Sequence, residues 1–286
     1  MAMKKTLDEL TLMDDYMFAQ VMRNTKYLKI LLEFILDIKI AKITLMEPQK
    51  SEKEGYNSKG VRLDLYVEDE NGVIYNVEVQ TYTEDYLSKR MRFYQSVLDI
   101  SILNPGHDYG ELRKTFVIFI CNYDPFKRDR VIYTFENVCR EEPDLTLGDD
   151  TFKIVVNTKG TRGEISDELR EILKYLDTEE VTGKISEELD NAVKEIKSSE
   201  ERRLEYMMLY TRDSEMMARG RREGMQIGKQ EGIQEGKILQ AISMYRELVN
   251  YDDPQITEAI MNKFNLSRAE AEKFVSGDVP SPADNK

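Results

Sequence analysis

The most informative pattern of hydrophobic and polar positions lies between Val61 and Thr81. Asn71-Gly72 separates two runs that are rich in valine, isoleucine, leucine and tyrosine. This pattern is typical of two antiparallel strands joined by a tight turn. With Asn71 and Gly72 as a two-residue loop, Leu65 is expected to lie opposite Glu78.

Three polar side chains are predicted to converge at one end of this hairpin. Asp64 lies early in the first strand, and Glu78 and Gln80 lie near the end of the second. Because side chains alternate between the two faces of a strand, Glu78 and Gln80 share one face, and Val77 and Val79 face the core on the other. Two carboxylates on adjacent strands form a hard-oxygen site that suits magnesium.

The same periodicities predict elements on either side of the hairpin. Helical spacing indicates one or two helices over residues 13–36, with Asp14 as a candidate N-cap, and another helix over 84–103. Alternation indicates a strand over 40–46. The continuous apolar run 115–121 indicates a strand that is buried on both faces.

The second half of the chain is predicted to add strands first and then helices. Residues 131–138 and 152–157 are expected to extend the sheet, and residues 165–176 and 185–217 are expected to be helical. Three short helices are expected from Ile238 onward, with Ser267 as the N-cap of the last.

Glycine recurs at every fourth position between residues 220 and 236, at Gly220, Gly224, Gly228, Gly232 and Gly236. This spacing keeps the glycines on one slowly drifting helical face, which lets two helices approach closely. The alternative is a flexible tether, because each glycine costs a helix about 1 kcal/mol relative to alanine. The pattern alone does not distinguish the two interpretations.

Composition and charge restrict the function classes. A chain of 286 residues with 41% hydrophobic content can bury one full domain and carry further helical material. It contains no apolar run of the roughly 18 to 20 residues that a membrane span needs, and a cytoplasmic location is expected. The net charge is −13, and residues 141–205 hold 19 acidic and 10 basic side chains. A DNA-facing site would therefore be built from the hairpin and residues 81–140.

Cysteine and histidine are too few for several kinds of site. The sequence has two cysteines, Cys121 and Cys139, and one histidine, His107. Neither a disulfide framework nor a zinc site of the usual ligand set can be assembled from them. Cys121 lies in an apolar run and is expected to be a small buried hydrophobic residue.

The order helix, three strands, helix, strand is that of the PD-(D/E)XK nuclease core. The signature of that superfamily is an acid on the second strand, followed by an acid, any residue and a lysine on the third. Here it appears as Leu63-Asp64 and Glu78-Val79-Gln80. More specifically, the chain resembles the PD-(D/E)XK family transposases, or recombination-promoting nucleases, whose opening helix matches Asp15-Tyr16-Met17-Phe18. The resemblance covers about residues 5–240.

The resemblance implies an α/β, restriction-endonuclease-like core with a C-terminal helical extension, and a magnesium-dependent DNA endonuclease that acts in recombination or mobile-element biology. Asp64, Glu78 and the backbone carbonyl of Val79 would hold Mg²⁺ or Mn²⁺. Gln80 stands where lysine is commonest; a neutral amide cannot act as a base, so Gln80 would orient the water. A Gln80→Lys variant is expected to preserve or raise activity.

The resulting domain organisation has five parts. They are the nuclease-like core (1–160), a helical region (161–219), a glycine-repeat helix or tether (220–237), a small helical bundle (238–277) and a disordered tail (278–286). A homodimer formed through the C-terminal helices is expected. The alternative function is a catalytically inactive, nuclease-derived protein that binds or oligomerises.

Two further assignments stay open at the level of sequence. Asp15 is either an acid in the first helical turn, next to the positive end of the helix dipole, or an acid that faces the metal. Lys89, Arg90 and Arg92 are either a solvated helix face or a clamp for DNA phosphates.

Overall fold

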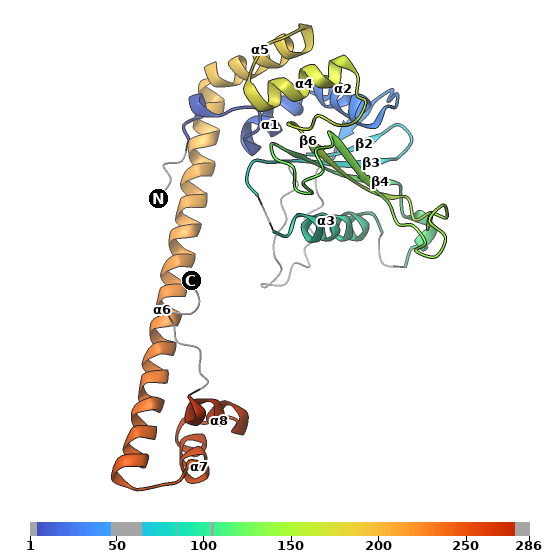
Figure 1. Cartoon of the computed structure of the whole chain (residues 1–286). Coiled ribbons are helices and arrows are strands. Elements are labelled where there is room, and N and C mark those ends of the chain that lie inside the picture. The colour runs from blue at the N-terminus through green and yellow to red at the C-terminus, as the bar shows by residue number, and fades with distance from the viewer. Residues whose placement is uncertain (1–4, 47–64, 84, 104–105, 278–286) are drawn as a thin grey trace. The chain divides into compact units, whose positions relative to one another are not determined.

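The computed structural model describes residues 5–46, 65–83, 85–103 and 106–277. Its centre is a six-stranded sheet with the strand order β1-β2-β3-β4-β6-β5 (Figure 1). β3, β4 and β6 run parallel, and the other three pairings are antiparallel. The strands are β1 (Ile43–Leu45), β2 (Leu65–Asp69), β3 (Ile74–Gln80), β4 (Thr115–Cys121), β5 (Ile132–Phe135) and β6 (Thr151–Asn157). The fold is therefore mixed α/β, with helices around one sheet.

The hairpin β2–β3 forms as predicted, but its loop is one residue longer. Leu65 pairs with Val77 and not with Glu78, so the predicted two-residue loop is wrong. The cause is Asp69, whose carboxylate accepts hydrogen bonds from the backbone N–H groups of residues 71 and 73 at 2.8 and 3.0 Å. Gly72 takes a φ of 78°, the left-handed conformation that closes a three-residue loop.

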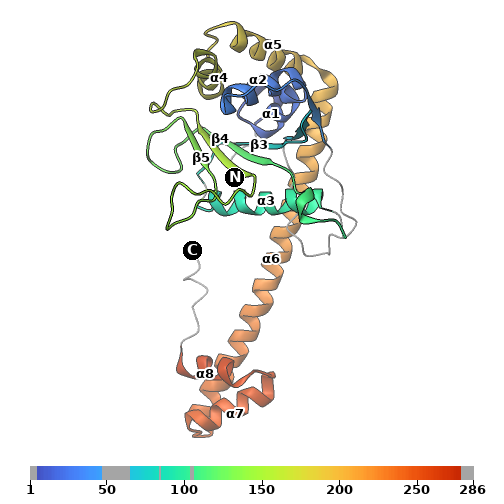
Figure 2. The ribbon, with the colours of Figure 1, turned by 90° about the vertical axis from the view of Figure 1, so that its right-hand side faces the viewer.

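Helices cover both faces of the sheet. α1 (Asp15–Met22), α2 (Thr25–Leu36), α4 (Asp167–Thr178) and α5 (Lys184–Ser198) lie on one face, and α3 (Leu87–Ile102) lies on the other (Figures 1 and 2). Val77 and Val79 point into the first core, as the alternation predicted. In β4, five of the seven side chains form a continuous buried run at its end, and they enter both cores.

The predicted helical segment 13–36 forms the two helices α1 and α2. Asn24 lies between them and caps α2, because its side-chain oxygen accepts a hydrogen bond from Lys26 N at 3.1 Å. Asp14 occupies the N-cap position of α1, but its carboxylate accepts a hydrogen bond from Thr11 N at 2.7 Å and pairs with Lys5. Asp14 therefore fixes the chain before the helix and does not cap the helix.

The C-terminal helices differ from the predicted boundaries. The segment 185–217 is broken at Ser199, and α6 (Glu200–Leu248) continues through all five glycines and through the first of the three short helices expected from Ile238. α7 (Asp253–Phe264) and α8 (Arg268–Ser276) follow, and Ser267 caps α8 by accepting a hydrogen bond from Glu270 N. The predicted tail, 278–286, lies outside the described residues.

The chain divides into two compact units, Met1–Tyr206 and Met207–Lys286. α4 and α5 belong to the first unit and share its core with α1 and α2. The second unit has a small core of its own, made by Ile238, Ala241, Ile242, Ile256, Ile260 and Ala271. Within the described residues, we find no helix that is both long and apolar enough to cross a membrane.

Candidate active site

Three polar side chains lie buried side by side on the face of β3 that α3 covers. Asn76, Glu78 and Gln80 are 0%, 1% and 2% exposed. The expectation that Glu78 and Gln80 share one face is therefore confirmed, although that face is buried and not open to solvent. A buried carboxylate is costly unless a charged or hydrogen-bonding partner compensates it.

Arg90, on α3, lies against these residues. Its Nη1 donates a hydrogen bond to Gln80 Oε1 at 2.8 Å, and its Nη2 lies 3.6 Å from Glu78 Oε2. Its Nε and Nη2 also contact the Tyr94 hydroxyl at 3.1 and 3.0 Å. The guanidinium carbon lies 5.3 Å from the centre of the Tyr94 ring and 5.2 Å from that of Phe119. A positive charge is thus fixed beside the two site residues of β3.

Asn76 joins the two strands of the hairpin to the same site. Its Nδ2 donates hydrogen bonds to Glu78 Oε1 at 3.0 Å and to the carbonyl of Leu65 at 3.2 Å. Glu78 is consequently held between an amide and a guanidinium, and its charge is compensated in the buried position. Neither Asn76 nor Arg90 belongs to the superfamily signature, and sequence reasoning did not place them at this site.

The backbone of β3 adds an oxygen next to Glu78. The Gln80 carbonyl accepts a hydrogen bond from Asn122 N at 3.3 Å, on the side of β4. Because the backbone groups of successive residues in a strand point in opposite directions, the Val79 carbonyl points toward the side of β2. A carboxylate and a carbonyl on adjacent residues are the hard oxygen ligands that magnesium prefers.

The other predicted metal ligands are placed differently. Asp64 lies outside the described residues, one position before β2 begins. Asp15 is exposed in the first turn of α1. Among the residues that the structure describes, no three histidine, cysteine, aspartate or glutamate side chains cluster so as to hold a metal ion. The described part of the site therefore supplies one carboxylate, Glu78.

The three basic residues predicted for DNA binding have separate surroundings. Lys89 and Arg92 are exposed, whereas Arg90 points inward to Glu78 and Gln80. The helical spacing contains a signal for this difference, since Arg90 lies four residues before buried Tyr94. Three adjacent basic residues in the sequence do not by themselves show which one lies on the buried side.

Cys121 is the residue of β4 that pairs with Gln80 across the sheet. It is completely buried, as expected for a small hydrophobic residue. Burial raises the pKa of its thiol to about 12. The thiol is therefore protonated at neutral pH and does not supply a nucleophile.

Comparison with protein families gives a match over most of the chain. The sequence model of the PD-(D/E)XK nuclease family transposases matches residues 12–217. The chain belongs to this family. Membership indicates a nuclease of the PD-(D/E)XK superfamily, whose members generally use divalent metal ions, and it implies DNA as the substrate. No curated protein and no solved structure matches the chain.

The opening motif of this PD-(D/E)XK family transposase is a packing motif from Tyr16 onward. The Tyr16 hydroxyl donates hydrogen bonds to the Arg202 carbonyl at 3.0 Å and to Glu205 Oε2 at 3.2 Å. Burial, together with the nearby Glu205 carboxylate, raises the pKa of Tyr16 to about 12. Met17 and Phe18 are completely buried. These three residues thus fasten α1 to the sheet core and to the start of α6.

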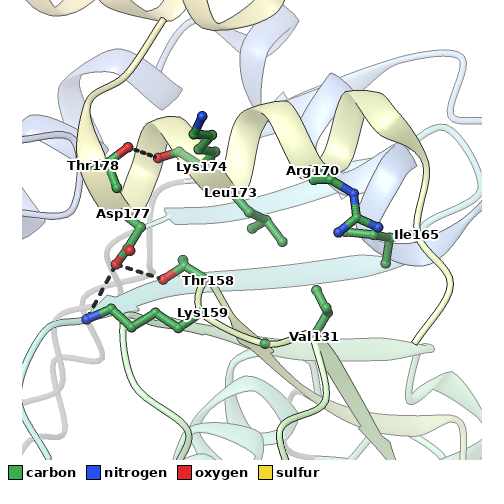
Figure 3. A pocket seen from close by; sticks show the side chains of 10 residues that line it. Val131, Thr158, Lys159, Ile165, Arg170, Leu173, Lys174, Asp177 and Thr178 are labelled. Carbon is green, nitrogen blue, oxygen red and sulfur yellow. Dashed lines mark hydrogen bonds and ion pairs between the residues drawn. The ribbon is translucent and has the colours of Figure 1, made fainter. Parts of the chain in front are cut away.

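Two cavities border the ends of the parallel strands. One, of about 290 Å³, is lined by Thr81 and Asn122, next to Gln80, and by the end of α4. The other, of about 190 Å³, lies between α4 and the loop after β6 and holds Lys159, Arg170 and Lys174 (Figure 3). Lys159 pairs with Asp177 at 3.6 Å, and Lys174 pairs with Glu180 at 2.7 Å. The first cavity is lined by the end of α4 and by none of Asn76, Glu78, Gln80 and Arg90. In the second cavity, two of the three cations are compensated by acids.

The position of Arg90 revises the expectation for Gln80→Lys. A lysine at residue 80 would bring its ammonium against the Arg90 guanidinium, which now donates a hydrogen bond to Gln80 Oε1 at 2.8 Å. Like charges in a buried position repel, so we expect this variant to be destabilised and to lose activity. Adding Arg90→Gln should restore both, because one cation then remains. Thermal melting and a nicking assay on both variants test this, and a single lysine variant as stable as the wild type would contradict it.

Proposed function

We propose that the protein is a magnesium-dependent DNA endonuclease of the transposase-like branch, which hydrolyses phosphodiester bonds in recombination or mobile-element biology. The observation that supports activity is the contact of Arg90 with both Gln80 and Glu78. The superfamily signature has a lysine at the position of Gln80. In this chain, α3 brings a positive charge to the side of that position.

The residues of the site fit a divalent cation in their chemistry. Glu78 and the Val79 carbonyl provide hard oxygens on neighbouring residues of β3, and Asp64 is the proposed second carboxylate. When bound there, magnesium would lower the pKa of water and stabilise negative charge on the phosphate. The Val79 carbonyl adds no charge of its own, so the two carboxylates would compensate the ion.

Gln80 and Arg90 have distinct proposed roles. The Gln80 amide is held at both ends, because its Nε2 donates to the Tyr82 carbonyl at 2.9 Å and its Oε1 accepts from Arg90. It can orient a water molecule through its remaining hydrogen and lone pair, but it cannot take up a proton. Arg90 keeps its charge at any physiological pH and favours negative charge on the scissile phosphate.

A nicking assay on supercoiled plasmid tests the proposal. The full chain should convert supercoiled DNA to the open circle with magnesium present, and it should stop when the metal is chelated. A metal titration by calorimetry should show binding that Asp64→Asn and Glu78→Gln both weaken. A folded protein that binds no divalent metal and cuts neither plasmid nor oligonucleotide would instead support the inactive, nuclease-derived binding protein.

We also propose that α6 holds two copies of the chain together. Among the described residues, an alanine Cβ at any of the five repeat glycines would meet no atom within 4 Å apart from the adjacent residues and the nearby backbone of its own helix. Large apolar side chains of the same helix are exposed: Met216, Met217, Met225, Ile227 and Ile233. A glycine face that is open in one chain permits close approach of a second helix, and a symmetric pair of chains would bring two active sites into one assembly.

Alanine substitution separates a dimer helix from a tether. Gly224→Ala, Gly228→Ala and Gly232→Ala together should weaken the dimer, because the new methyl groups hold the backbones apart. In an isolated helix the same changes would be stabilising by about 1 kcal/mol each. Light scattering measures the dimer, and circular dichroism measures the helix. Gln226→Ala combined with Gln230→Ala changes another face of the helix and is the control, which should leave the dimer intact. A full-length chain that is monomeric at micromolar concentration would contradict the dimer and leave the repeat as a tether.

A further inference from the structure

Large aromatic side chains are exposed after β3 and on α3, the two elements that carry the described residues of the candidate active site. Tyr82 follows β3 and is 61% exposed, Tyr86 at the start of α3 is 65% exposed, and Phe93 on α3 is 44% exposed. Tyr86, Lys89 and Phe93 are spaced three and four residues apart, which places them on one face of the helix. Burying aromatic surface is favourable, so a row of exposed rings at a functional site indicates a binding surface.

Two of these aromatic residues are tied to the site through the backbone. The Gln80 amide donates a hydrogen bond to the Tyr82 carbonyl at 2.9 Å. The Arg90 backbone N–H donates to the Tyr86 carbonyl at 2.9 Å. Gln80 and Arg90, which contact each other at the site, therefore also bond to the backbone from which the two tyrosine rings extend.

Positive charge is interleaved with the rings. The Lys89 Nζ lies 5.3 Å from the centre of the Tyr86 ring, and Arg92, which precedes Phe93 in the sequence, is exposed. Within the described residues, neither Lys89 nor Arg92 forms an ion pair at 4 Å or less. The positive charges of both side chains are therefore not compensated by a paired acid there. A nucleic acid has negatively charged phosphates and flat bases, and it complements this combination of cations and rings better than the apolar face of a partner helix does.

We propose that Tyr82, Tyr86 and Phe93 form a stacking surface for unpaired bases, and that the preferred substrate is therefore single-stranded or locally opened DNA. This inference rests on the proposed nuclease function and specifies its substrate. Paired bases expose only their edges, whereas an unpaired base offers its face to a tyrosine ring. Lys89 and Arg92 contact the backbone phosphates, and the strand leads to Glu78 and Gln80.

The absence of tryptophan from the sequence allows a direct test in the full chain. Tyr86→Trp introduces a single tryptophan on the proposed surface, whose emission can be excited separately from that of the tyrosines. With the metal chelated so that no cutting occurs, a single-stranded 20-mer should quench the emission in a saturable way, and a duplex of the same sequence should bind at least tenfold more weakly. Equal affinity for both forms, or binding of the single strand without quenching, would overturn the proposal.

Alanine variants provide the matched comparison. Tyr86→Ala and Tyr82→Ala should each weaken single-strand binding about fivefold or more, and should change duplex binding by less than a factor of about two. Tyr109→Ala removes a tyrosine that is 81% exposed beyond the other end of α3, and it should change neither affinity. Equal losses for single strand and duplex would identify a nonspecific contact and reject stacking.

The test also separates this inference from the nuclease proposal and from a protein partner. Metal-dependent nicking that Glu78→Gln abolishes, without any preference for single strands, would reject the stacking surface alone. Quenching without nicking under any metal condition would reject the nuclease alone. Emission of the Tyr86→Trp variant that shifts with protein concentration in the absence of DNA would assign the exposed face to a second copy and overturn the proposal.

Discussion

Glu78→Gln is expected to abolish magnesium-dependent nicking while the protein stays folded. The substitution keeps the shape of the side chain and removes its charge, so the proposed metal site loses a carboxylate without a cavity being opened. We expect the nicking rate to fall by at least about 10²-fold. Because Glu78 is only 1% exposed, glutamine is a cleaner change than alanine, which would leave a void next to Arg90.

Glu68→Gln is the matched control for this prediction. Glu68 lies on β2 and pairs with Arg113 at 2.7 Å, in a partly exposed position. Its substitution makes the same chemical change in the same hairpin and should leave the nicking rate within a factor of about two, since exposed ion pairs contribute little. Nicking rates and circular-dichroism melting curves are compared for both variants. A Glu78→Gln protein that cuts at the wild-type rate would show that the metal site lies elsewhere.

Arg90→Met is expected to lower stability as well as activity. It removes the cation next to a carboxylate that stays buried, and breaking such a pair from one side costs about 3 kcal/mol. For a unit of this size, that loss corresponds to a fall of roughly 10 °C in the melting temperature. Nicking should also be lost, because the positive charge at the Gln80 position disappears.

A double variant distinguishes the two effects of Arg90. Arg90→Met combined with Glu78→Gln should recover most of the lost stability, because neither charge then remains buried, but it should recover no activity. Arg92→Met removes an exposed neighbouring guanidinium and should change stability by less than about 0.5 kcal/mol. The melting temperatures of the wild type, Arg90→Met, Glu78→Gln and the double variant form a double-mutant cycle. Additive losses in that cycle would show that Arg90 and Glu78 do not interact.

The sequence carried enough information to place the strands of the hairpin and to put Glu78 and Gln80 on one face. Both depend on alternation within a strand, which is a local property. The loop length was missed because Asp69 holds the backbone N–H groups of residues 71 and 73, and no hydrophobic pattern encodes that contact. Boundaries of the long helix were missed because glycine propensity predicts weakness at positions where α6 continues.

Arg90 was predicted from the sequence only as one of three candidate DNA-binding residues, and its contact with Gln80 and Glu78 was not predicted. Its interaction with β3 joins residues ten and twelve positions apart through the packing of a helix on a sheet. Periodicity predicts which side of α3 is buried, but it does not predict which strand residue lies opposite. The metal ligand Asp64, in contrast, is identified by the superfamily signature and remains a prediction, because it lies outside the described residues.

The opening motif has a consequence for how such proteins can diverge. Tyr16, Met17 and Phe18 hold α1 in place by packing and hydrogen bonds, and none of them contacts Glu78 or Gln80 through a described interaction. Substitution of Glu78 or Gln80 can therefore abolish cleavage without removing a described contact of this motif. A descendant that lost Glu78 or Arg90 would keep its opening helix and its ancestry would stay recognisable. The described contacts of the opening motif thus serve the fold, Glu78 and Gln80 carry the proposed chemistry, and Arg90 contributes to both.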